Sequence, residues 1–193
     1  MRIGIDLDNT LADYRRPLER LCALHGLGDS QADPKLALRD HLRDAGREGE
    51  WTRLQGELYG PLMEEALLFT GAEQFLARCR EQGAECHIVS HRTRRPISGS
   101  DHDLHEAARL WLARLGLSGV PAYFEETKKQ KLERIASLGL DVFIDDLPEI
   151  LTDPGFPVHT EAILFDPGDR HARHEDIRRA PTWMAVEDAM FAE

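Results

Sequence analysis

The sequence predicts an α/β fold with a Rossmann-like parallel sheet flanked by helices and a small helical cap inserted after the first strand. Two observations support this prediction. Short apolar runs typical of buried strands alternate with helical segments, which indicates parallel strands joined by crossover helices. After the first apolar run, roughly fifty residues show only the helical spacing of apolar side chains.

The strands are predicted where apolar residues form short runs, at residues 3–7, 86–90, 123–124, 141–145 and 162–165. The helices between them are predicted from their capping signals. Thr70 and Glu73 have capping-box spacing and predict a helix that ends at Gly83, and Thr127 with Gln130 predicts one that ends at Leu138. Further helices are expected from a cap at Ser100 or Asp101 to Leu115, and over 183–191.

Three helices are expected in the insert, with apolar positions at 18–24, 36–42 and 51–62. The predicted domain organisation is therefore an α/β core formed by 1–10 and 64–193, and a helical cap over 11–63.

Composition limits the classes of function. The chain has 193 residues and a net charge of −11, which argues against a broad nucleic-acid surface because phosphate backbones are bound by excess Lys and Arg. No run approaches the roughly 18 to 20 apolar residues of a membrane span, and an acidic residue comes too early for a signal peptide. We therefore expect a cytoplasmic protein with no membrane partner and with three free thiols; a homo-oligomer is compatible with the sequence.

Polar residues follow three of the predicted strands, at Asp6 to Thr10, at Ser90 to Arg92, and at Asp145 and Asp146. In open α/β sheets, ligands bind at the carboxyl ends of the strands. These residues, which are far apart in sequence, are therefore expected to converge on one crevice.

Two acidic pairs would meet at this edge, Asp6 with Asp8 and Asp145 with Asp146. A lone Asp-x-Asp is common in turns and helix caps. Two carboxylate pairs side by side would repel each other unless a cation lies between them. Magnesium (Mg2+) prefers such oxygen ligands, whereas zinc would need His or Cys ligands that this edge lacks. The sequence thus predicts a magnesium site.

These residues resemble the four signatures of the haloacid dehalogenase (HAD) superfamily, in order. Ile3–Thr10 is similar to the first, a strand followed by Asp-x-Asp-x-Thr; His87–Ser90 resembles the second; Lys131 matches the third; and Val142–Asp146 resembles the fourth. Each motif alone is weak, but the ordered set is specific. The layout is nearest to the deoxyribonucleotidase-like capped phosphatases.

The resemblance implies the chemistry of the acidic residues. Asp6 would be the nucleophile that forms an aspartyl-phosphate, and Asp8 the general acid and then the general base. Magnesium would be held by the Asp6 carboxylate, the Asp8 backbone carbonyl and Asp146, with Asp145 bound directly or through water. HAD dehalogenases lack the second aspartate, so Asp8 favours phosphate-ester chemistry.

The resemblance also implies the phosphate-binding group. Ser90 would donate a hydrogen bond to a phosphoryl oxygen, and Thr10 belongs to the same group. Lys131 would balance charge and orient Asp6. Lys128 lies about one helical turn away, near the same face, and is the alternative for the functional lysine; the spacing to Asp145 favours Lys131.

The substrate is expected to be a small phosphorylated metabolite, either a nucleoside monophosphate or a sugar phosphate. The segment from His91 to His102 is rich in Arg and His. It is either a solvated loop or a substrate-binding loop in which His91 and Arg92 contact a polar part of the substrate. Two alternatives to a phosphatase stay open: a non-catalytic phosphate-binding or regulatory module, and a phosphotransferase with an acceptor other than water.

Overall fold

The computed structural model of the chain describes residues 1–28, 33–99, 101–171 and 176–191. The chain forms two compact units. Unit 1 consists of Met1–Ala12, Leu68–His91 and Val120–Glu193, and unit 2 of Asp13–Leu67 and Arg92–Gly119. The chain therefore passes between the units four times, after residues 12, 67, 91 and 119.

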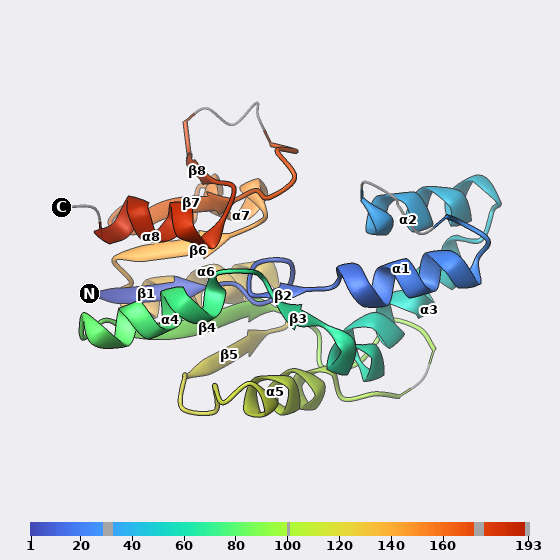
Figure 1. Cartoon of the computed structure of the whole chain (residues 1–193), viewed down its shortest axis with the longest axis horizontal. Helices are drawn as coiled ribbons and strands as arrows, with labels where there is room; N and C mark the ends of the chain where they lie inside the picture. The colour runs from blue at the N-terminus through green and yellow to red at the C-terminus, as the bar shows by residue number, and fades with distance from the viewer. Residues whose placement is uncertain (29–32, 100, 172–175, 192–193) are drawn as a thin grey trace. The chain divides into compact units, whose positions relative to one another are not determined.

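Unit 1 contains a six-stranded sheet whose neighbouring strands are all parallel (Figure 1). In sheet order the strands are β5 (Ala122–Glu125), β4 (Glu85–His91), β1 (Arg2–Ile5), β6 (Val142–Asp145), β7 (Glu161–Phe165) and β8 (Arg178–Ala180). The predicted α/β class with a parallel sheet is confirmed, and β8 is an additional strand. Because β4, β1 and β6 are adjacent, their carboxyl ends lie side by side.

Helices cover both faces of this sheet (Figure 1). On one face α4 (Ala72–Glu81) and α8 (Trp183–Phe191) contact each other, and α4 packs on β4 and α8 on β7 and β8. On the other face lie α6 (Lys128–Leu138) and the short α7 (Pro148–Leu151). This second face buries an apolar cluster from α6, α7, three strands and the segment between α6 and β6: Val89, Leu132, Ile135, Leu140, Phe143, Ile150, Leu151 and Leu164.

Unit 2 is helical. Its helices are α1 (Arg15–Leu24), α2 (Pro34–Asp44), α3 (Glu48–Tyr59), the 3-10 helix η1 (Pro61–Glu65) and α5 (Leu104–Arg114). Two short paired strands, β2 (Ala12–Asp13) and β3 (Leu67–Leu68), contain two of the four points where the chain changes unit. The helices expected in the insert are present, and α5 packs with α3 and η1. The predicted boundaries of a cap at 11–63 stay a prediction.

The capping signals gave mixed results. Thr127 caps α6 as predicted, because its hydroxyl accepts a hydrogen bond from the Gln130 backbone N–H at 3.2 Å. The capping box at Thr70 was wrong: Gly71 caps α4, in a left-handed conformation with φ of 92° that glycine adopts without strain.

The start of α5 also differs from the prediction. Asp103 caps the helix, and its carboxylate accepts a hydrogen bond from the Glu106 backbone N–H at 3.0 Å. The helix therefore begins at Leu104 rather than beside Asp101, and Ser100 lies outside the described residues. No helix in the described ranges is both long and apolar enough to cross a membrane.

His87 in β4 is an exception to the usual pairing of buried polar atoms. Both of its ring nitrogens are cut off from solvent, and neither has a hydrogen-bond partner among the described residues. The ring stacks on Tyr123 with the ring centroids 6.3 Å apart. Burial lowers the pKa of His87; Glu85 opposes this shift and Arg2 adds to it.

We predict that His87→Phe stabilises the protein and reduces its sensitivity to acid. The substitution keeps a ring against Tyr123 and removes the unpartnered nitrogens, so the free energy of unfolding should rise by about 1 kcal/mol at neutral pH. In the native chain the folded state holds the neutral imidazole, so stability should fall as the pH drops through the unfolded pKa of about 6.5.

Denaturant unfolding at about pH 7.5 and about pH 5.5 measures both effects. The variant should lose less stability than the native chain over this interval. The exposed His159 offers the matched control, since His159→Asn removes a histidine without changing the contact between His87 and Tyr123. An equal loss in the native chain and His87→Phe would contradict the prediction.

Candidate active site

The loop after β1 begins the site. The Asp6 backbone N–H donates to the Ile144 carbonyl at 2.8 Å and so extends the contact between β1 and β6. Beyond it, the N–H groups of Leu11 and Ala12 both donate to the Leu7 carbonyl, at 3.1 and 2.8 Å. Asn9 has a positive φ of 62°. This tight turn holds Asp6, Asp8 and Thr10 at the carboxyl edge of the sheet.

Lys131 lies at the centre of the site. Its ammonium nitrogen is 2.6 Å from Oδ1 of Asp6 and 2.6 Å from Oδ2 of Asp145. All three side chains are buried, and that of Lys131 is 1 % exposed. The second oxygen of Asp145 accepts a hydrogen bond from the Leu147 backbone N–H at 2.9 Å. Asp145 is thus engaged through both oxygens, and it anchors the lysine beside Asp6.

The buried charges around Lys131 and Asp6 shift the pKa values of both residues. Burial raises the pKa of Asp6 most; Lys131 lowers it, and the carboxylates of Asp145, Asp146 and Asp8 raise it again, so that it stands well above its ordinary value. Burial alone would lower the pKa of Lys131, but Asp145 and Asp6 outweigh this and raise it. The raised pKa favours the charged form of Lys131, and one ammonium group faces several carboxylates.

A metal ion fits this imbalance. Asp6, Asp145 and Asp146 are all buried, and each offers a carboxylate oxygen within 4.8 Å of the others. When all three carboxylates are ionised, they and the one ammonium leave an excess of two negative charges, which a divalent cation would offset. Because Lys131 and Leu147 occupy the oxygens of Asp145, the side chains best suited as ligands are Asp6 and Asp146. Hard oxygen ligands of this kind suit magnesium.

Thr10 and Trp183 fix the position of Asp146. The Thr10 hydroxyl accepts a hydrogen bond from the Asp146 backbone N–H at 3.1 Å and lies 3.4 Å from Oδ1 of that residue. The indole N–H of Trp183 donates to the Thr10 carbonyl at 3.2 Å, and its ring packs against Phe75 and Phe165. Sequence reasoning grouped Thr10 with the phosphate-binding residues and missed Trp183, because a tryptophan in an apolar helix carries no signal of such a contact.

Ser90 comes to the same edge from β4. It is 1 % exposed, and its hydroxyl lies 3.4 Å from Oδ2 of Asp8. Asp8 itself is half-buried. The hydroxyl donor and this carboxylate thus lie beside each other near Asp6, as the predicted convergence of strand ends requires.

The other predicted residues have different surroundings. Lys128 lies 2.6 Å from Oδ2 of Asp153, and its side chain is 39 % exposed, so the lysine that joins the carboxylate group is Lys131. The Nε2 atom of His91 is 3.2 Å from the Glu126 carbonyl.

Arg92 belongs to the interior of unit 2, where it is 4 % exposed. Its guanidinium donates to the Tyr14 hydroxyl at 2.9 Å and to the carbonyls of Leu104 and Tyr59 at 3.0 and 3.3 Å. The Arg92 carbonyl is 2.8 Å from Nε2 of His105. These contacts join α1, α3 and α5 inside unit 2, and the predicted substrate contacts of Arg92 and His91 stay predictions.

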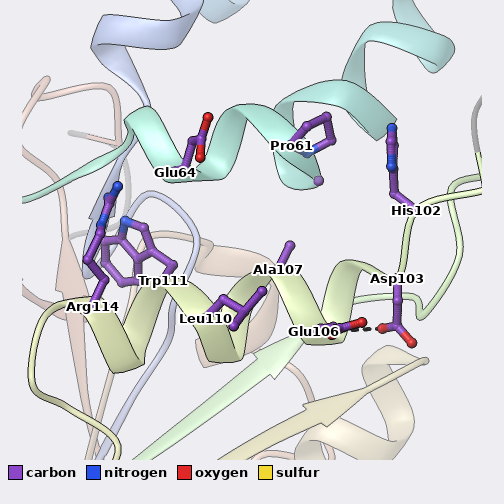
Figure 2. A pocket seen from close by; sticks show the side chains of 10 residues that line it. Pro61, Glu64, His102, Asp103, Glu106, Ala107, Leu110, Trp111 and Arg114 are labelled. Carbon is purple, nitrogen blue, oxygen red and sulfur yellow. Dashed lines mark hydrogen bonds between the residues drawn. The ribbon is translucent and has the colours of Figure 1, made fainter.

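Unit 2 also contains a hollow of about 350 Å³ between η1 and α5 (Figure 2). Trp111, Ala107 and Pro61 contribute apolar surface, and Glu64, Asp103 and Glu106 contribute carboxylates. None of the residues predicted to act on phosphate or metal lines it. Arg114 and His102 line it as well, so the hollow carries side chains of both charges.

Comparison with solved structures identifies the fold. A HAD phosphatase from Thermococcus onnurineus is 14 % identical with a TM-score of 0.55, and the match covers 100 % of this chain and 98 % of that one. A protein provisionally described as the HAD-hydrolase YfnB, from Bacillus subtilis and bound to magnesium, is 14 % identical with a TM-score of 0.60, covering 98 % of each chain. Protein tyrosine kinase A of Mycobacterium tuberculosis is 17 % identical with a TM-score of 0.61, covering 97 % and 96 %.

No protein-family model matches the sequence, and no curated protein matches it. The chain has the fold of the HAD superfamily, and many of its structural neighbours are hydrolases or phosphatases of that superfamily. The four ordered motifs agree with this fold. Its branch within the superfamily, predicted to be deoxyribonucleotidase-like, stays a prediction.

The two candidate lysines should differ sharply in their effect on stability. Lys131→Met leaves Asp6 and Asp145 buried without their cation, which should lower the free energy of unfolding by about 3–5 kcal/mol. Lys128→Met removes a partly exposed ion pair and should cost less than about 1 kcal/mol. Denaturant unfolding in the presence of a chelator measures both. A loss from Lys128→Met equal to that from Lys131→Met would contradict the assignment.

Proposed function

We propose that the protein is a magnesium-dependent phosphatase that hydrolyses a small phosphorylated metabolite through an aspartyl-phosphate. The observation that supports this most is the contact of Lys131 with the buried Asp6, at the edge where Asp8, Ser90 and Asp146 also lie. In the proposed mechanism these side chains would serve as the nucleophile, the acid/base, the hydrogen-bond donor to the phosphate and the metal ligands.

Asp6 would attack phosphorus. Lys131 holds one of its oxygens, which orients the carboxylate and leaves the other oxygen for the new bond. The same ammonium would lie close to the transferring phosphoryl group and stabilise its charge. The P–O bond to the leaving group breaks as the Asp6–phosphorus bond forms.

Asp8 would handle the protons. In the first step its carboxylic acid would protonate the leaving oxygen, and in the second its carboxylate would take a proton from the water that attacks the aspartyl-phosphate. Its neighbour Ser90 would donate a hydrogen bond to a phosphoryl oxygen. Both roles need Asp8 near the leaving oxygen, which its position two residues after Asp6 allows.

The metal would be held by the carboxylates of Asp6 and Asp146 and by the Asp8 backbone carbonyl, with Asp145 acting mainly through Lys131. When bound, magnesium would supply positive charge that keeps Asp6 ionised and offsets the charge of the phosphate. Thr10, itself held by Trp183, would keep Asp146 in position.

For the substrate we favour a nucleoside monophosphate or a sugar phosphate. The helices of unit 2 are comparable to the cap that many capped phosphatases use to enclose small substrates. Hydrolysis of these two classes of compound, tested side by side, would separate them.

A phosphotransferase is the second candidate, because a protein tyrosine kinase shares the fold at a TM-score of 0.61. The formation of an aspartyl-phosphate would be common to both activities. Release of inorganic phosphate from the phosphorylated enzyme, compared with and without added hydroxyl acceptors, distinguishes hydrolysis from transfer.

Activity should depend on Asp6 and on the metal. With an aryl phosphate as substrate, Asp6→Asn should lose at least about 1,000-fold in kcat, since the amide is a poor nucleophile. Chelation should abolish turnover, and added magnesium should restore it. The exposed Asp44 gives a control, because Asp44→Asn should keep full activity. Unchanged hydrolysis by Asp6→Asn would exclude the proposed nucleophile.

The role of Asp8 predicts a dependence on the leaving group. Asp8→Asn should reduce the hydrolysis of an alkyl phosphate by about 100-fold or more, because an alkoxide needs protonation as it leaves. An aryl phosphate with an acidic phenol should lose much less in the first step. Single-turnover release of the two alcohols measures this difference. Equal losses would show that Asp8 is not the general acid.

A further inference from the structure

Two of the three cysteines lie next to each other in unit 1. Cys79 is in α4 and fully buried, and Cys86 is in β4 and half-buried. A short turn connects them, in which the Ala84 N–H donates to the Cys79 carbonyl at 2.9 Å and Gly83 adopts a positive φ of 65°. The helix and the strand therefore fold back on each other with the two side chains in the same interface.

Side chains alternate along β4, and Val89 belongs to the apolar cluster on the α6 face, so Cys86 points to the opposite face, where α4 lies. There its side chain is hydrogen-bonded to that of Cys79. Two cysteines on adjacent packed elements with facing side chains are the arrangement from which a disulfide can form. The third cysteine, Cys22, has different surroundings: it is in unit 2, and its thiol donates to the Pro34 carbonyl at 3.3 Å. The sequence alone predicted three separate free thiols, since Cys79 and Cys86 lack the Cys-x-x-Cys spacing.

The members of the pair differ in reactivity. The hydrogen bond from Cys79 lowers the pKa of Cys86; burial opposes this shift, and the charge of Arg80 adds to it. The same hydrogen bond and burial raise the pKa of Cys79. Cys86 is the more exposed residue and has the lower pKa, so it is the thiol that a reagent meets first.

We propose that Cys79 and Cys86 form a peroxide-reactive dithiol site that closes to a reversible disulfide. The attacking sulfur is that of Cys86, which is accessible, and the resolving sulfur is that of Cys79, which is in contact with it. Low-pKa, accessible cysteines placed next to a resolving cysteine are the usual sites of reversible thiol oxidation.

The reaction balances with a hydroperoxide as the oxidant. The Cys86 thiolate attacks one peroxide oxygen, the O–O bond breaks, and Cys86 becomes a sulfenic acid while water leaves. The Cys79 sulfur then attacks the Cys86 sulfur, loses its proton and displaces a second water. Two thiols and one hydrogen peroxide give one disulfide and two waters, with two electrons passing from sulfur to oxygen.

The chain offers a direct readout of this bond. Trypsin cleaves after Arg78, Arg80 and Arg92, so Cys79 and Cys86 fall into different peptides, 79–80 and 81–92. After exposure of the reduced protein to hydrogen peroxide, blocking of the remaining thiols and digestion without reductant, we expect these two peptides linked. The intact mass should fall by about 2 Da, one thiol should remain titratable in denaturant, and a dithiol reductant should restore all three.

Two variants test the assigned roles against a matched control. Cys86→Ala should leave Cys79 reduced, because the remaining thiol is fully buried. Cys79→Ala should let Cys86 proceed to sulfinic acid, because it has no resolving partner. Cys22→Ala should form the linked peptides as the native chain does.

The peptide and thiol measurements on the native chain test the proposal even if a variant fails to fold. The proposal is overturned if peroxide leaves three titratable thiols, or if it converts Cys86 to sulfinic acid without linked peptides. A disulfide that includes Cys22 would overturn it equally.

Discussion

The site depends on one buried ammonium group. Lys131 lies 2.6 Å from both Asp6 and Asp145, and it is the cation that allows several carboxylates to share the interior at the edge of the sheet. Removing such charges from water costs several kcal/mol for each ion unless partners compensate. Lys131 compensates only part of this cost. The remaining negative charge opposes folding and would attract a divalent cation, so the binding of such a cation would also stabilise the fold.

The sheet order makes this arrangement of charge attainable. Strands β4, β1 and β6 are neighbours in the sheet, and their carboxyl ends bring Ser90, Asp6 and Asp145 to one edge, although long stretches of chain separate these residues. Helix α6 lies on the face that contains the apolar cluster and directs Lys131 from there to the strand ends. On the opposite face, α8 places Trp183 against the Thr10 carbonyl. Helices from both faces therefore hold the acidic residues, and the geometry of the site is inseparable from the packing of the core.

Much of the core and its acidic residues could be predicted from the sequence, because the signals are local. Apolar runs predicted β1, β4, β6 and β7, and the polar residues that follow them predicted the convergence. The spacing to Asp145 predicted Lys131 as the functional lysine and left Lys128 as an alternative. Only the structure distinguishes the two, because it shows Lys128 paired with Asp153. Strand β8 was missed because its sequence, Arg-Arg-Ala, has no apolar pattern; its place depends on pairing with β7.

Other features depend on contacts between distant parts of the chain, which no local pattern encodes. Arg92 stands in a polar, basic segment that is typical of a solvated loop, yet its guanidinium is buried against Tyr14, Tyr59 and Leu104. Residues 92–119 belong to the same unit as 13–67 also because of contacts between distant parts of the chain: α5 packs on α3 and η1. Gly71, and not Thr70, caps α4, and a side chain at Gly71 would come within 3.1 Å of Trp183 in α8, a contact that the local sequence does not reveal.

Likeness of fold cannot decide the reaction of this site, and the reason is chemical. A phosphatase and a protein named as a tyrosine kinase share the fold at low identity. In the mechanism proposed here, Asp6, Lys131 and the metal serve the formation of an aspartyl-phosphate, a half-reaction common to hydrolysis and to phosphotransfer. The two outcomes diverge only when Asp8 activates the second nucleophile, which is water in one case and a hydroxyl acceptor in the other. The residues that distinguish the reactions are therefore those that admit or exclude an acceptor beside Asp8, and not the acidic cluster itself.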